Sequence, residues 1–126
     1  MIWDSYVVLA GSLVGDELES SQRSAVSRAY YGVFNLARRR LEGHGIPIDN
    51  RRAHDRVWRT FKAAEGATPD TTAEWRMIGE LGAALRRLRN QSDYADVVPD
   101  LGRESVKAVA AAERIVALLE EIKFAA

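Results

Sequence analysis

The stretch that decides the fold reads RSAVSRAYYGVFNLAR from Arg23 to Arg38. Its apolar side chains recur every three to four residues, which is the period of an amphipathic helix. The apolar stripe consists of Val26, Tyr30, Val33, Ala37 and Leu41. The pattern extends over residues 20–43 and ends at Gly43 and Gly45, because glycine commonly follows the last turn of a helix. The sequence therefore predicts a long helix with one face in a hydrophobic core.

The same periodicity predicts four further helices on both sides of this one. They cover residues 2–15, 50–63, 70–93 and 100–124. The expected core stripe of the first helix consists of Ile2, Tyr6, Leu9 and Leu13, and that of the last consists of Val106, Val109, Glu113 and Val116. Because the connecting loops are short, neighbouring helices should run antiparallel. We therefore expect an all-α fold, an up-and-down bundle of about five helices in a single domain over residues 1–126.

The composition fits a globular domain and excludes several kinds of site. The chain has 126 residues, of which 47% are hydrophobic and 29% charged. It has no cysteine, which excludes disulfides, thiolate metal sites and cysteine nucleophiles. His44 and His54 have no metal-ligand spacing, so we expect no metal and no cofactor. With no leader sequence and no apolar run of about 20 residues, we expect a cytoplasmic protein that does not enter a membrane.

Charge is distributed unevenly, although 18 Lys and Arg balance 18 Asp and Glu. Residues 23–62 carry ten basic and three acidic side chains, a net charge of +7, whereas both flanking segments are net acidic. Fifteen of the basic residues are Arg, which binds phosphate and carboxylate through two parallel hydrogen bonds. The balance excludes a globally basic protein but not a local basic surface. Drift in genomic base composition is the alternative explanation for the Arg bias.

Arg89 lies within the apolar arc of the predicted helix over 70–93. At 100° per residue it falls about 20° from Ile78, between Leu85 and Gly82. A charged side chain rarely faces a core unless it is paired or functional. Asp93 lies one turn further on, so an (i, i+4) ion pair is the purely structural alternative.

The opposite face of the predicted helix over 20–43 carries Arg28, Tyr31 and Asn35. An exposed aromatic ring among arginines is typical of a nucleic-acid or nucleotide surface, because aromatic rings stack on bases and guanidinium groups bind phosphate. A dimer interface, where Tyr and Arg are also enriched, and a solvated polar face are the alternatives.

Two segments resemble the HEPN-domain family. Residues 23–38 resemble its second helix, which typically reads S-A-x-x-R-A-Y-Y-A-x-F-x-x-A-R. Residues 85–94, which read LRRLRNQSDY, are similar to its element L-x-x-x-R-x-x-A-D-Y. The resemblance spans about residues 5–122 and implies a helical bundle that commonly dimerises. Many members are metal-independent ribonucleases, found as toxins beside small nucleotidyltransferases or in defence systems, and others bind nucleotides or are non-catalytic.

The resemblance also implies roles for individual residues. In the family's catalytic motif an Arg is followed, after four to six residues, by a His. Arg89 matches the motif Arg and Asn90 the polar residue after it, whereas Tyr94 stands where the family has His. The Arg steadies charge on the phosphate, and the His moves protons, which a Tyr does not do readily near neutral pH. His54 is an alternative partner for Arg89, although a lone helical His is more often structural.

We therefore expect a homodimeric module that binds RNA or a nucleotide, with a nucleotidyltransferase-type antitoxin as a further partner. The expected binding residues are Arg28, Tyr31, Asn35, Arg89, Asn90 and Asp93. The alternative is an active or weakened metal-independent ribonuclease toxin that uses Arg89 with Tyr94 or His54. A third hypothesis is a purely structural helical subunit that neutralises another protein.

Overall fold

The computed structural model describes residues 3–14 and 18–125. These residues form five α-helices: α1 (Asp4–Leu13), α2 (Glu19–Gly43), α3 (Ala53–Lys62), α4 (Thr72–Tyr94) and α5 (Leu101–Glu121). A short 3-10 turn, Pro69–Thr71, precedes α4. The described residues contain no strand, only an isolated bridge between Ala67 and Phe124. The predicted all-α fold is confirmed, while the ends expected for the first helix, at residues 2 and 15, lie outside the described residues.

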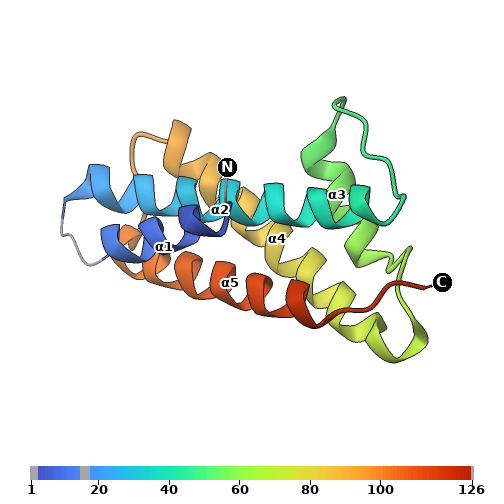
Figure 1. Ribbon diagram of the computed structural model, residues 1–126. Coiled ribbons are helices and arrows are strands. Elements are labelled where there is room, and N and C mark those ends of the chain that lie inside the picture. The colour runs from blue at the N-terminus through green and yellow to red at the C-terminus, as the bar shows by residue number, and fades with distance from the viewer. Residues whose placement is uncertain (1–2, 15–17, 126) are drawn as a thin grey trace.

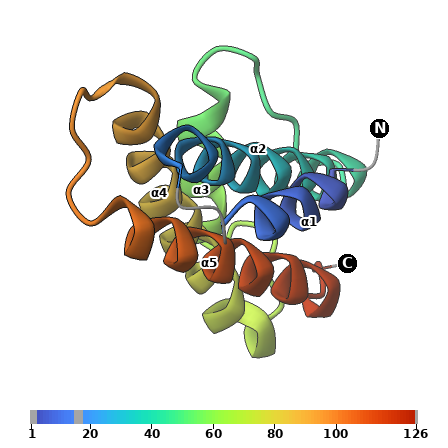
Figure 2. The ribbon, with the colours of Figure 1, turned by 90° about the vertical axis from the view of Figure 1, so that its left-hand side faces the viewer.

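The helices form a bundle in which direction alternates (Figure 1). α2 and α5 run side by side in the same direction, α4 runs against both, and α1 runs against α2. α3 lies across the bundle axis and packs mainly on α4, on the side away from α5 (Figure 2). The expected antiparallel arrangement is therefore found for α1 with α2 and for α4 with α5, but it is wrong for α3, which crosses between α2 and α4 instead of running against them. Among the helices of the described segments, none has both the length and the apolar character needed to cross a membrane.

The core lies where α2 faces α4 and α5, with α3 closing one side. Its largest buried side chains include Tyr30, Leu41, Trp58, Phe61, Trp75, Ile78, Ile115 and Leu118. The stripe predicted for α2 is correct, because all five of its residues are buried. Burial of these large side chains is the main force holding the helices together.

The core faces of α1 and α5 differ from the expected ones. Leu9 is 40% exposed and Val106 is 55% exposed, and Glu113 also lies on the surface. The residues that face the core instead include Ala10 in α1 and Ala108 in α5. Small side chains allow two helices to approach closely, and hydropathy patterns weigh them less than a nearby Leu or Val. The expected stripes were therefore wrong at Leu9, Val106 and Glu113, whereas Val109 is buried and Leu13 and Val116 pack against the core as expected.

Two glycines of α4, Gly79 and Gly82, allow α3 to pack directly against the backbone of α4. A Cβ atom built on Gly82 would lie 2.2 Å from Cε3 of Trp58, and one built on Gly79 would lie 2.5 Å from the backbone nitrogen of Lys62. The Trp58 indole thus packs directly on the backbone of α4, where any larger residue would collide with it. This contact sets the position of α3 relative to α4.

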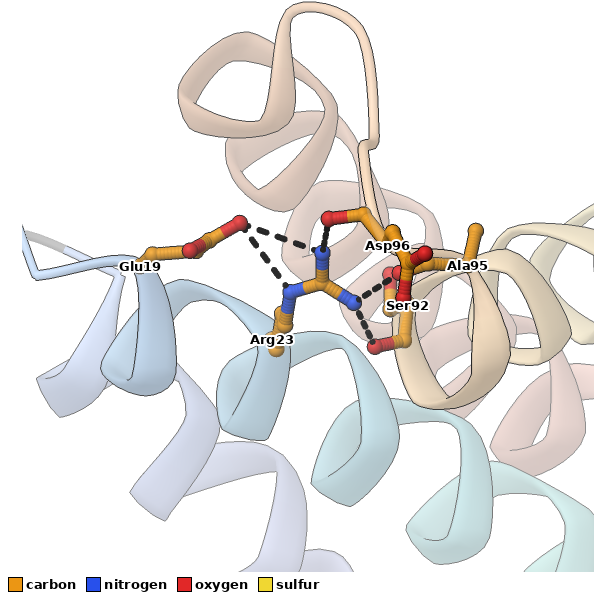
Figure 3. A network of polar contacts seen from close by, with 5 residues as sticks. All are labelled: Glu19, Arg23, Ser92, Ala95 and Asp96. Carbon is orange, nitrogen blue, oxygen red and sulfur yellow. Dashed lines mark hydrogen bonds and ion pairs between the residues drawn. The ribbon is translucent and has the colours of Figure 1, made fainter.

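Arg23 of α2 fixes the carboxyl end of α4 (Figure 3). Its Nη1 donates to the carbonyl oxygens of Ser92 and Ala95, both at 2.7 Å, and its Nη2 donates to that of Asp96 at 3.0 Å. Glu19, one turn before Arg23, holds the guanidinium through an ion pair of 3.1 Å. The last carbonyls of a helix lack partners within it, so these bonds cap α4. α2 thereby holds the last turn of α4 in place.

Candidate functional site

The side chain of Arg89 is 10% exposed and packs against two adjacent tyrosines of α2. Its Cζ lies 4.6 Å from the ring centroid of Tyr31 and 5.4 Å from that of Tyr30. Nη2 donates to the hydroxyl of Tyr31, and Nη1 donates to Oδ1 of Asn90 at 2.8 Å. Arg89 thus lies inside the apolar arc, as its angle on the helix predicts, because cation–π contacts and polar partners accommodate the charge.

Asp93 gives Arg89 only a loose ion pair. Nε of Arg89 lies 3.6 Å from Oδ2 of Asp93, and this buried Nε has no hydrogen-bond partner among the described residues. A guanidinium has five N–H donors, so Arg89 keeps donors that the fold does not use. The structural alternative, an (i, i+4) pair, is present, but it leaves part of the hydrogen-bonding capacity of the guanidinium unused.

His54 of α3 lies in the same aromatic cluster. Its Nδ1 is 2.6 Å from the hydroxyl of Tyr30, and this hydroxyl also accepts a hydrogen bond of 3.1 Å from Nε1 of Trp58. The imidazole stacks on Phe34, with ring centroids 3.9 Å apart, and meets the ring of Tyr31 edge-on. His54 and Arg89 therefore contact the same pair of tyrosines from two different helices.

His54 is neutral and offers one hydrogen-bond donor. Burial, followed by the positive charges of Arg86, Arg89 and Arg38, lowers its pKa from the usual 6.5 to about 4. Burial also raises the pKa of Tyr30 to about 12, so its hydroxyl stays protonated. The hydroxyl proton of Tyr30 has no other acceptor among the described residues, so we assign it to donate to Nδ1, and this assignment places the proton of His54 on Nε2. No described residue accepts a hydrogen bond from Nε2.

We expect the depressed pKa of His54 to make the fold sensitive to mild acid. An imidazole with a pKa lower in the folded than in the unfolded chain takes up a proton on unfolding, so its contribution to stability falls as pH drops from about 6.5 to about 4. With allowance for solvent screening, the loss should be about 1–2 kcal/mol. Urea unfolding at several pH values measures it. His54→Gln keeps an acceptor for Tyr30 and should make the free energy of unfolding less dependent on pH between about 4 and 6.5. An unchanged pH dependence in this variant would contradict the low pKa of His54.

The structure places the predicted residues of α2 differently from expectation. Tyr31 was expected to be exposed, but it is half-buried, because Arg89 and His54 cover its ring. Asn35 donates from Nδ2 to the backbone oxygen of Tyr31 at 2.8 Å, a bond within the helix. Arg28 is exposed, and its Nε donates to Ser24 at 3.2 Å. Of these three residues, Arg28 remains the one with a charge available at the surface.

Tyr94 does not join the Arg89 cluster. Five residues along an α-helix correspond to a turn of about 140°, so Tyr94 points away from Arg89. Its side chain is 79% exposed. The structure therefore brings Tyr31, Asn90 and Asp93 to Arg89 and leaves Tyr94 outside. The position that corresponds to the family's catalytic His is not part of this site.

Sequence reasoning did not assign Tyr30, Trp58 or Arg86 to the site. Tyr30 and Trp58 carry polar atoms on side chains that belong to the core, and their hydrogen bond joins residues 28 positions apart. The one signal in the sequence is the adjacent pair Tyr30-Tyr31, since neighbouring residues of a helix point about 100° apart and can line two sides of one site.

The described part of the chain contains no group of three or more His, Asp or Glu side chains that could hold a metal ion. Comparison with known proteins gives no match, whether with family models, with curated proteins or with solved structures. The function of the site is therefore inferred from its own side chains.

Proposed function

We propose that this protein is a cytoplasmic domain that binds RNA or a nucleotide through a phosphate held by Arg89 and His54. The observation that carries the proposal is a buried guanidinium with unused donors beside a neutral imidazole with a free Nε2–H. Both groups present donors to a ligand, because the acceptor nitrogen of His54, Nδ1, is already bonded to Tyr30, and donors suit the oxygens of a phosphate. Arg supplies the charge, and the imidazole supplies a directed neutral donor.

The electrostatics of the site favour an anion. Arg38, Arg86 and Arg89 are all close enough to His54 to lower its pKa. Asp93, the acidic side chain beside Arg89, makes only the loose contact of 3.6 Å. A positive charge removed from water is unfavourable unless it is compensated, so a phosphate would relieve the excess.

RNA binding should depend strongly on salt. We expect the affinity of a single-stranded RNA to fall steeply between about 50 and 200 mM salt, because phosphate contacts release counterions. Arg28→Ala should weaken binding a few-fold and lower the slope against log salt by about 1. Fluorescence anisotropy measures both, with Arg114→Ala on α5 as the matched control. Absence of binding of both RNA and a nucleotide at low salt would refute the proposal.

The HEPN resemblance extends the proposal to the assembly. It implies a homodimer and a nucleotidyltransferase-type antitoxin partner. Light scattering should give a mass twice the 14.0 kDa of the chain, and a monomer mass would exclude the dimer. Co-purification with the product of a neighbouring nucleotidyltransferase gene tests the partner.

A ribonuclease is the second candidate, and the proximity of His54 to Arg89 favours it. Arg89 would steady charge on the phosphate, and His54 would move protons. A pKa of about 4 and a proton on Nε2 leave His54 a poor general acid and base at neutral pH, so we favour binding. In an RNA cleavage assay, cleavage lost in both Arg89→Met and His54→Gln but kept in Tyr94→Phe would support the nuclease. Intact RNA with the wild-type protein would exclude it.

A further inference from the structure

A cleft of about 380 Å³ lies between α3 and α4, beside the Arg89 site. Its lining includes the basic side chains of Arg59, Lys62, Arg86 and Arg87, but only one carboxylate, Asp55. Asp55 is already paired with Arg59 at 2.9 Å. The cleft therefore carries a surplus of positive charge.

Three of these cations have no acidic partner. No ion pair within the described residues engages Lys62, Arg86 or Arg87, although the ion pairs of other arginines are present on the same helices. Unpaired cations scattered over a convex surface are ordinary, whereas three that line one concavity raise the potential inside it. The cleft thus has the charge and the shape of an anion site.

The cleft is continuous with the Arg89 site through two residues of α4. Arg86 lines the cleft and also lowers the pKa of His54, so its charge reaches both places. Asn90 lines the cleft and accepts the hydrogen bond from Arg89. Residues 86 and 90 are one helical turn apart, about 6 Å along the axis. Two cationic sites therefore lie next to each other along one helix.

We propose that the cleft between α3 and α4 is a second phosphate site, which holds the backbone phosphate next to the one bound at Arg89. This inference rests on the proposed function and sharpens it: the ligand is an RNA strand with consecutive phosphates rather than a single nucleotide. Two adjacent sites bind a linked pair of phosphates more tightly than separate ones, because the second contact is intramolecular. Free pyrophosphate carries the same pair of groups and is the other source of this chemistry.

The test compares two double variants of equal charge change. Lys62→Ala/Arg87→Ala removes two exposed cations of the cleft, and Lys107→Ala/Arg114→Ala removes two exposed cations of α5, which has no contact with α3 in the described structure. The probes are an RNA of about eight nucleotides, AMP and inorganic pyrophosphate. We expect the cleft variant to lose about tenfold or more in RNA affinity, with a salt slope lower by about 2, and to bind AMP as the wild type does. The α5 variant should bind all three probes as the wild type does.

Each other result refutes the inference in a recognisable way. RNA binding unchanged in the cleft variant would overturn it, and loss of binding in Arg89→Met would then still support the proposed function. An equal loss of RNA affinity in the α5 variant would overturn the inference, because the loss would then follow from the change in net charge and not from the cleft. The third result is that the wild-type protein binds pyrophosphate, the cleft variant does not, and neither binds RNA. This result would refute both the RNA strand as the ligand of the cleft and the proposed function.

Discussion

Replacing Gly82 by alanine is expected to destabilise the protein by about 3 kcal/mol or more. The added Cβ would lie 2.2 Å from Cε3 and 2.3 Å from Cζ3 of Trp58, far inside van der Waals contact. The indole cannot move aside, because it is 2% exposed and is held by its hydrogen bond to Tyr30. Relief would require α3 to separate from α4. Urea unfolding followed by circular dichroism measures the loss.

Gly102→Ala, in the first turn of α5, is the matched control. Its Cβ would meet only Nε2 of Gln22 at 3.5 Å, an ordinary contact, so stability should stay the same or rise by up to about 1 kcal/mol. The double variant Gly82→Ala/Trp58→Leu should lose less than the sum of its two single variants, since the smaller side chain removes the collision. If Gly82→Ala were as stable as Gly102→Ala, α3 would not rest on α4 as described, and the junction that holds His54 near Arg89 would be wrong.

Periodicity predicted the helices and the core face of α2 because that face is built from large apolar side chains. It failed where the contact is made by small ones. Ala108 packs inward in α5 while Val106 is exposed, and hydropathy ranks these two residues the other way round. Gly82 was placed in the apolar stripe of α4, but its role depends on the Trp58 indole, which comes from another helix.

The same distinction separates the predicted from the missed parts of the site. Arg89 could be found from the sequence, because a charge in an apolar arc is visible within one helix. The partnership of His54 with Tyr30 could not, because it depends on the crossing of α3 over the bundle. Tyr31 was expected on the surface for a similar reason, since no pattern within α2 reveals that Arg89 of α4 and His54 of α3 cover its ring. A motif counted along α4 likewise assigned Tyr94 to the site, although the helix turns it away from Arg89.

Replacing Arg89 by methionine is expected to lower RNA affinity by about 30-fold to 100-fold at low salt. Hydrogen bonds between charged groups contribute about 1.5–3 kcal/mol each, and the proposed phosphate contact at the centre of the site depends on this guanidinium. Methionine keeps much of the length that packs on Tyr31, and removing a buried charge together with its desolvation is often neutral for stability. Arg89→Lys should also lose most of the affinity, because the single nitrogen of an ammonium group cannot take the positions of both Nη1 and Nη2, which bind Asn90 and Tyr31. Anisotropy titrations measure the affinity, and thermal unfolding confirms that the variants are folded.

The pKa of the His54 imidazole provides a second readout, which reports both the charge of Arg89 and the charge of a bound phosphate. Arg89 is one of the three charges that lower the pKa of His54, so in Arg89→Met that pKa should rise from about 4 toward 6.5. Nuclear magnetic resonance of the His54 ring follows the titration, with Arg114→Ala as the control that should leave it unchanged. A bound phosphate should also raise the pKa of His54 in the wild-type protein, since a nearby negative charge favours the imidazolium. If RNA bound equally well to Arg89→Met and left the His54 titration unaltered in the wild type, the ligand would have to bind elsewhere on the protein. A loss of affinity accompanied by both pKa changes would place the phosphate between Arg89 and His54.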